Sequence, residues 1–230
     1  FPTRRSSDLG ERGKTREISS LEATGLKEKA IETYLQIASH YPEFEELDKV
    51  HFYLAHEFRE LGKYSEMVDQ YESILKEFPF SEFVPESLLL LGDHAYEEKN
   101  IDQALGYYLN VLQYPKSSAV VIARYKLAWV HINKRNYSQA LDLFEQSVKN
   151  RISPSTVDVD TYNRVDIRLE ALADMAYTYS QVYKETKPGD DSKYFKDIAW
   201  SRRSYIMVME KLSKRYMIKH KWDNAAYIYR

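Results

Sequence analysis

One pattern recurs along this chain at nearly constant spacing, and it limits the possible folds more than any other feature. A small or apolar anchor residue returns at intervals of 37, 37 and 36 residues, and an aromatic residue follows each anchor by four positions. The anchors are Ala30, Met67, Ala104 and Ala140, and the aromatic residues are Tyr34, Tyr71, Tyr108 and Phe144. Self-similarity at such a period indicates a stack of repeated units in place of one closed core.

Each unit is predicted to be a hairpin of two antiparallel helices. The segments upstream of the anchors, "HFYLAHEF", "LLLLGDHAY" and "RYKLAWVHI", each contain Leu followed by a small residue. A small residue lets two helix backbones approach, and the aromatic residue four positions after the anchor fills the groove between them. We expect Gly62 or Asn100 to end a first helix, and Pro42, Pro79 and Pro115 to follow second helices. Stacking then buries the apolar face that one hairpin leaves exposed.

The register breaks after Asn150. Turn-rich segments at 151–161 and 184–193 predict loops, and the apolar spacing within 162–183 predicts an amphipathic helix between them. The repeat pattern returns at Leu212, Tyr216, Trp222, Ala225 and Tyr229. We interpret 10–149 as about four repeats, and 150–230 as an irregular repeat with loop insertions and a truncated final repeat. Together they would form one solenoid of about six repeats.

Both ends of the sequence are abrupt. The stretch "FPTRRSSDL" at 1–9 corresponds codon by codon to a common sequencing adapter, so we expect it to be an artefact and exclude it from the fold. The final "WDNAAYIYR" stops inside an amphipathic pattern. We therefore expect a fragment of a longer reading frame, whose true termini and any signal peptide are missing.

Composition limits the classes of partner. The net charge of −2 provides no global basic field for nucleic acid, and no apolar run has the length of a transmembrane helix. We expect no nucleic-acid partner, and membrane association only if a lipid anchor exists in the missing N-terminus. Cysteine is absent, which excludes disulfides and thiolate chemistry.

No segment carries a recognisable catalytic, cofactor or metal motif, so we expect no enzyme activity and no cofactor. His94 and His131 occupy similar repeat positions, but packing or solvent-facing roles explain them better than a metal site. "DVD" at 158–160 and "GDD" at 189–191 lack the spacing of a calcium loop, and Asp160 and Asp191 are interpreted as helix caps. The basic stretch 211–221 is interpreted as a solvated helix face, with an acidic partner or lipid headgroups as the alternative.

The hairpin pattern resembles the tetratricopeptide repeat family over about residues 11–149. The resemblance implies an all-α fold, a right-handed α-solenoid of antiparallel helix hairpins, that binds a peptide or partner helix in a concave groove. The groove positions implied by the family are Phe52, His56, Arg59, Leu89, Asp93, Tyr96, Tyr125, Trp129 and Ile132. Trp129 is the most informative, either as an exposed binding anchor or as a residue packed on the next repeat.

The family resemblance also bears on the class of partner. Repeats that clamp the acidic C-terminus of chaperones use Lys and Asn at positions that here hold mostly aromatic or apolar residues, which disfavours a chaperone co-factor. The connectors "YPEFEEL", "FPFSEFVPES" and "YPKSSAVVIA" resemble those of bacterial cell-envelope repeat proteins of the outer-membrane assembly, Tol-Pal and gliding-motility types. We expect a non-catalytic scaffold, periplasmic or outer-membrane-associated. The alternatives are a cytoplasmic adaptor or regulator, and the repeat region of an enzyme whose catalytic domain lies outside this fragment.

Overall fold

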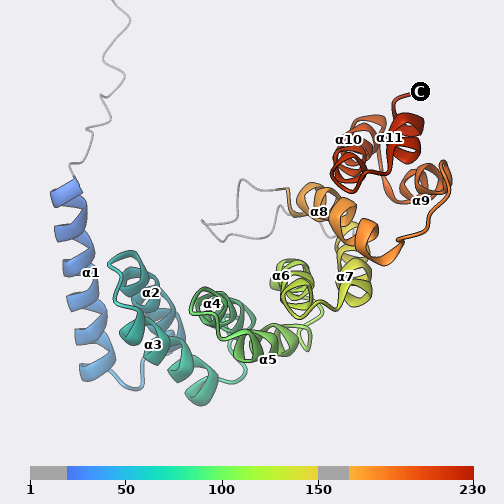
Figure 1. Ribbon diagram of the computed structural model, residues 1–230. Helices are drawn as coiled ribbons and strands as arrows, with labels where there is room; N and C mark the ends of the chain where they lie inside the picture. The colour runs from blue at the N-terminus through green and yellow to red at the C-terminus, as the bar shows by residue number, and fades with distance from the viewer. Residues whose placement is uncertain (1–19, 150–165) are drawn as a thin grey trace, which may run out of the picture. The chain divides into compact units, whose positions relative to one another are not determined.

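A computed structural model describes residues 20–149 and 166–230, and all regular structure in these ranges is helical (Figure 1). The helices are α1 Ser20–His40, α2 Leu47–Glu60, α3 Tyr64–Glu77, α4 Val84–Glu97, α5 Ile101–Val111, α6 Ala119–Asn133, α7 Tyr137–Lys149, α8 Ile167–Val182, α9 Asp190–Ile198, α10 Arg202–Ile218 and α11 Trp222–Ile228. The predicted adapter stretch and the predicted loop at 151–161 lie outside the described residues.

The chain forms two compact units, residues 1–70 and 71–230, with their boundary inside α3. In the first unit α1 packs on α2, and Lys27 of α1 forms an ion pair of 2.8 Å with Glu60 at the end of α2. Leu54 and Ala55 of α2 are fully buried, as the repeat pattern predicts. The predicted division into about four regular repeats at 10–149 and irregular repeats at 150–230 stays a prediction.

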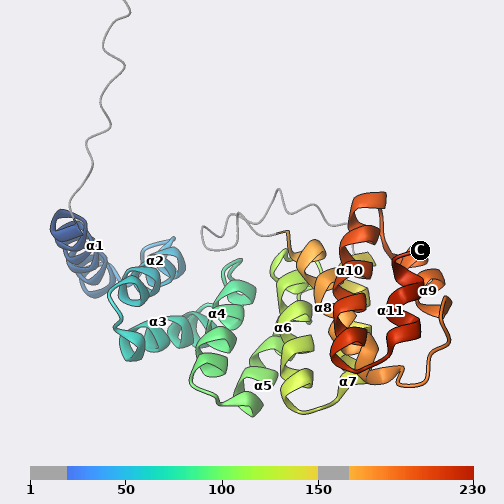
Figure 2. The ribbon, with the colours of Figure 1, turned by 45° about the horizontal axis from the view of Figure 1, so that its top comes forward.

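The second unit is a row of hairpins. α4 packs on α5, α6 on α7, and α10 on α11, and each hairpin also contacts the next. α4 contacts α6, α6 contacts α8, and α8 contacts α10, so these four helices form one continuous surface (Figures 1 and 2). We call it the first-helix face. Successive hairpins in contact confirm the predicted all-α solenoid.

The repeat anchors lie where helices touch. Ala104 and Ala140 are fully buried, and so are Tyr108 and Phe144 four residues later. A Cβ atom on Gly92 of α4 would lie 2.5 Å from Cε1 of Tyr108 in α5, which is closer than atoms pack. The small residue and the aromatic residue are therefore complementary parts of one contact, as predicted from their spacing.

Residues with left-handed backbone end four of the first helices, α2, α4, α6 and α10. Gly62, Lys99, Arg135 and His220 have φ between 57° and 70°. After each, the next amide donates to the carbonyl five residues back, as Asn100 N does to Ala95 O at 2.8 Å. This is the Schellman arrangement, which satisfies carbonyl groups at a helix end. The prediction for Gly62 is confirmed, whereas Asn100 caps the following helix by accepting from Gln103 N, and Lys99 ends the preceding one.

The segment after residue 166 differs in detail from the sequence prediction. The predicted helix 162–183 is α8, and the Asp166 carboxylate caps it by accepting from the amides of Arg168 and Leu169. α9 begins inside the predicted loop 184–193, because Gly189, at φ 102°, turns the chain into the helix. The interpretation of Asp191 as a cap is wrong: its side chain is 1% exposed and accepts from the Tyr179 hydroxyl at 3.3 Å.

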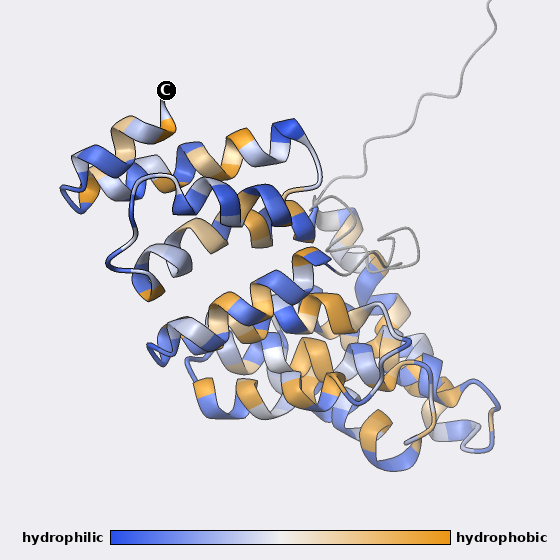
Figure 3. Ribbon diagram, turned by 90° about the vertical axis from the view of Figure 1, so that its right-hand side faces the viewer, coloured by the Kyte–Doolittle hydropathy of each residue, from blue (hydrophilic) through white to orange (hydrophobic). Residues whose placement is uncertain are grey.

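The hydropathy of successive residues changes along the helices, as expected where one side of each is buried (Figure 3). Side chains of the six helices from α6 to α11 form one continuous core in the second unit. Its largest fully buried members include Phe144, Phe195 and Tyr216. Trp129 and Tyr125 of α6 pack against this core while keeping part of their surface exposed. The core thus fixes the position of both aromatic side chains.

Candidate binding surface

The residues implied by the family resemblance all lie on first helices. Phe52, His56 and Arg59 are on α2, Leu89, Asp93 and Tyr96 on α4, and Tyr125, Trp129 and Ile132 on α6. The α2 residues belong to the first unit and the other six to the second. The structure therefore gathers six of the nine on one described surface.

Two of the nine side chains are core residues. Leu89 is fully buried, and Phe52 is 5% exposed, with the His56 ring against its edge at a centroid distance of 4.8 Å. Neither presents enough surface for a partner to contact. They support the surface from beneath, and the accessible candidates are the half-buried residues around them.

Asp93 links three helices. It is 5% exposed, accepts a hydrogen bond of 2.6 Å from the Tyr108 hydroxyl in α5, and lies 3.1 Å from Nζ of Lys126 in α6. A buried carboxylate with such partners mainly holds its neighbours in place. Farther along α4, the Tyr96 hydroxyl accepts from Nδ2 of Asn133 at 2.6 Å, which ties α4 to the end of α6.

Tyr125 and Trp129 form the most developed part of the surface. The Tyr125 hydroxyl donates to Oδ2 of Asp174 in α8 at 2.9 Å, and both rings pack against Phe144. Burial raises the pKa of Tyr125 and the pKa of Asp174 above their ordinary values. The Trp129 indole packs against the core and stays partly exposed, and its role as a binding anchor stays a prediction.

Sequence reasoning missed Asp174. It lies 49 residues after Tyr125, beyond the break in the repeat register, so no local spacing connects the two. Lys211 of α10 lowers and Glu170 of α8 raises the pKa of Asp174, which places both charges near it. An aromatic pair therefore lies beside charges of both signs on adjacent first helices.

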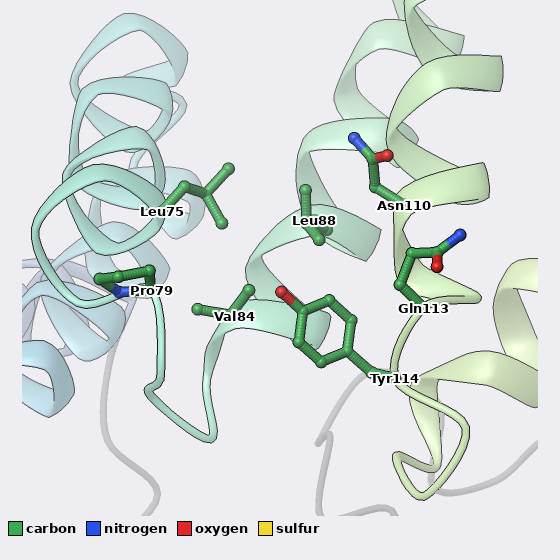
Figure 4. Close-up of a pocket in the computed structure, with 7 residues that line it drawn as sticks. All are labelled: Leu75, Pro79, Val84, Leu88, Asn110, Gln113 and Tyr114. Atoms are coloured by element: carbon green, nitrogen blue, oxygen red, sulfur yellow. The ribbon is translucent and has the colours of Figure 1, made fainter.

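Two hollows lie at the connectors between helices of the second unit. Leu75, Val84, Leu88 and Tyr114 line a cavity of about 290 Å³ with Asn110 and Gln113 at its side (Figure 4). The adjoining hollow, about 700 Å³, follows the connectors at 79–85 and 113–118. Phe80 at its rim is fully exposed. The lining is proline-rich and aromatic, and carries no catalytic arrangement.

The described residues contain no cluster of three potential metal ligands among His, Asp and Glu. His94 and His131 accordingly have no third ligand in this part of the chain. No helix in the described ranges is both long and apolar enough to cross a bilayer.

Comparison with known proteins agrees with the fold. Residues 123–151, which include most of α6 and all of α7, match the tetratricopeptide repeat family. Among solved structures, the chain is similar to BtubC (BKLC) from P. vanneervenii, with 13% identity and a TM-score of 0.56 over 91% of this chain and 88% of that one. At this identity the likeness extends to the fold alone. The comparison with curated proteins gave no match.

A further similar structure is the apo form of the quorum sensor NprR from B. thuringiensis, with 19% identity and a TM-score of 0.48. The likeness covers 91% of this chain but spans only 58% of that protein. The fold assignment rests on the hairpin packing, the repeat match and the first of the two structures. Residues 123–151 thus match a tetratricopeptide repeat, and the described residues of the chain form an all-α solenoid.

Proposed function

We propose that this protein is a non-catalytic interaction scaffold that binds an extended peptide or a partner helix on the first-helix face of its second unit. The observation that carries the proposal is the arrangement of Tyr125 and Trp129, held by Asp174 and Phe144 with part of each ring exposed. Aromatic side chains fixed in this way provide large contact area at little cost in conformational entropy.

The surrounding side chains give the surface a defined chemistry. Ile132 and Tyr96 extend the apolar area along α6 and α4, while the charges of Lys211 and Glu170 act on Asp174. A partner that fits would place an apolar side chain against Trp129 and a polar group toward these charges. In the first unit, His56 and Arg59 stay a prediction for partner binding, whereas Phe52 is too buried to contact a partner.

Selection from a displayed random-peptide library, followed by fluorescence polarisation, tests the proposal. We expect Trp129→Ala to weaken a selected peptide by about tenfold, because a truncated anchor typically costs more than about 1 kcal/mol. Trp222→Ala is the matched control, because this indole is on α11 and is 59% exposed. Equal affinity of wild type and Trp129→Ala would exclude the first-helix face as the binding surface.

We also propose that the protein belongs to a multiprotein complex of the bacterial cell envelope. The connector sequences suggest that it is periplasmic or associated with the outer membrane. The cytoplasmic adaptor and the repeat region of a larger enzyme are the alternatives. Sequencing the native gene on both sides of these residues separates them. A signal peptide before residue 10 supports the envelope setting, and a soluble continuation or a catalytic domain supports an alternative.

A further inference from the structure

A group of cations gathers where three segments of the second unit meet. The α6–α7 turn contributes Arg135, the segment after α8 contributes Lys184, and α10 with the turn after it contributes Arg215, Lys219 and Lys221. We call these five residues the basic edge. From its sequence, the stretch 211–221 is expected to form one solvated helix face. In the structure α10 ends at Ile218, and Lys219 and Lys221 lie in the turn that follows.

Hydrogen bonds and electrostatic repulsion show that four of these cations lie close together at the end of α8. Nζ of Lys219 donates to Ser180 O at the end of α8 at 2.5 Å, and Nζ of Lys221 donates to Lys184 O. Burial lowers the pKa of Lys219, and Lys221, Lys184 and Arg215 lower it further, so these charges act on one another. The carbonyl groups at the C-terminus of α8 attract cations, which partly explains why Lys219 and Lys221 lie close together despite their like charge.

Two members of the basic edge border a hollow of about 580 Å³. Arg135 and Lys184 line it from two segments, and Tyr137, Asn136 and Gln181 lie between them. The Arg215 guanidinium lies 4.9 Å from the ring centre of Tyr177, which in turn packs edge-on against Tyr137. The hollow therefore has cations at its borders and amide and phenol groups along its walls.

None of the five cations has an ion-pair partner in the described part of the chain. The adjacent Lys134 differs, since it pairs with Asp102 at 2.5 Å. Two of these cations, Arg135 and Lys184, line the hollow, and the mutual repulsion of the clustered charges opposes folding. An anionic partner would remove that repulsion.

We propose that the basic edge binds an acidic peptide segment of a partner protein, with Asp or Glu carboxylates between Arg135 and Lys184. A peptide enters a hollow of this size, whereas a flat lipid surface does not. Duplex nucleic acid is bound through contacts with many successive phosphates, and the cluster is confined to one end of the hairpins. The inference extends the proposed scaffold to a second surface and does not require the first-helix face.

Fluorescence polarisation with a short fluorescein-labelled polyglutamate peptide tests the proposal on the full chain. We expect the double variant Arg135→Glu and Lys184→Glu to weaken binding by about tenfold, because each reversal replaces attraction by repulsion. Both side chains are exposed, and thermal unfolding checks that the variant stays folded. Lys219 and Lys221 are left unchanged, because they also hold the end of α8.

Lys116→Glu is the matched control, an exposed lysine in the connector before α6. The 15 residues of α6 place it about 22 Å from the α6–α7 turn. It should leave the affinity within about twofold, as expected for a charge beyond the screening length. Trp129→Ala should also leave polyglutamate binding unchanged, which separates a failure of this inference from a failure of the first-helix face.

Three results would overturn the inference. The first is an unchanged affinity of the double variant, and the second is an equal loss with Lys116→Glu, which would indicate unspecific attraction. The third is tighter binding of a DNA duplex or of anionic vesicles than of polyglutamate at the same salt concentration, which would identify another class of partner.

Discussion

The contact between Gly92 and Tyr108 shows how one residue sets the distance between two helices. Tyr108 is fully buried and its hydroxyl is fixed on Asp93, so its ring has no room to withdraw. The missing Cβ of Gly92 provides the space that the ring occupies. The phenol and the carboxylate in turn hold α4, α5 and α6 together through Lys126.

We predict that Gly92→Ala lowers the free energy of unfolding by about 1–3 kcal/mol, the usual range for overpacking a filled core. Gly106→Ala is the control in α5, where a Cβ meets no atom within 4 Å. It should raise stability by about 0.5–1 kcal/mol, because Ala is the better helix former. Urea denaturation measures both. A neutral Gly92→Ala would contradict the close contact.

Asp191 gives a prediction about pH. Burial raises its pKa, although hydrogen bonds from Tyr216 and Tyr179 oppose the shift. The folded state therefore binds the proton more tightly than the unfolded state, whose carboxyl has a pKa of about 3.9. As pH rises from that value through the raised pKa, the group lowers the free energy of unfolding, and the loss persists above it.

Asp191→Asn removes this titration, and its amide oxygen can still accept from Tyr179. We expect the variant to gain stability relative to wild type as pH rises through this window. Denaturation at a series of pH values measures the difference, with Asp190→Asn as the exposed neighbouring control. A difference that stays constant with pH, or falls, would show that the carboxylate is stabilised by its partners.

At the scale of helices and turns, the recurring structure is the left-handed residue that follows α2, α4, α6 and α10. Gly62 adopts this conformation freely, whereas Lys99, Arg135 and His220 adopt it with a side chain. A side chain in the left-handed region costs about 1–2 kcal/mol. The turn is kept because the hydrogen bonds that close the helix require it.

We predict that Lys99→Gly raises the free energy of unfolding by up to about 1 kcal/mol, because relief of backbone strain exceeds the added chain entropy. Lys99→Ala should give no such gain, since it keeps the Cβ atom. Lys99 is exposed, so few side-chain contacts are lost. Thermal unfolding compares the two variants, and equal stability of both would show that the conformation carries no strain.

A substitution at Ala140 tests whether the repeat anchors were aligned correctly. Ala140 is fully buried in α7. We expect Ala140→Leu to lower the free energy of unfolding by about 1–3 kcal/mol, because the added atoms have no space between the helices. Ala226→Leu in α11, an exposed position one residue after a buried anchor, is the control. Unchanged thermal unfolding of Ala140→Leu would mean that the register is wrong.

Spacing along the sequence predicted these helix contacts because they are local. Leu91, Gly92, Ala104 and Tyr108 belong to one hairpin, and their positions repeat in the next. Asp174 beside Tyr125, and Lys184 opposite Arg135, arise from packing between hairpins after the repeat register breaks. Of the left-handed residues that end helices, the sequence predicted only Gly62, because Lys99, Arg135 and His220 carry side chains that rarely adopt this conformation. Asp191 was misread because a polar residue near a helix start usually caps it, whereas α9 turns this one inward.

At the scale of the molecule, the second unit presents two surfaces with different chemistry. The first-helix face combines Tyr125 and Trp129 with Asp174, and the basic edge combines Arg135 and Lys184 with three further cations. They arise from different parts of the same hairpins, the sides of the first helices and the turns at their ends. One partner could contact both, in which case the two affinities would reinforce each other.

Photo-crosslinking of a library-selected peptide that carries a benzophenone group tests the central proposal most directly. We predict that mass spectrometry locates the adducts on α6, α8 and α10, and that Trp129→Ala removes them while Trp222→Ala does not. Adducts confined to α5, α7 or α11, or adducts that persist in Trp129→Ala, would contradict a binding surface on the first helices.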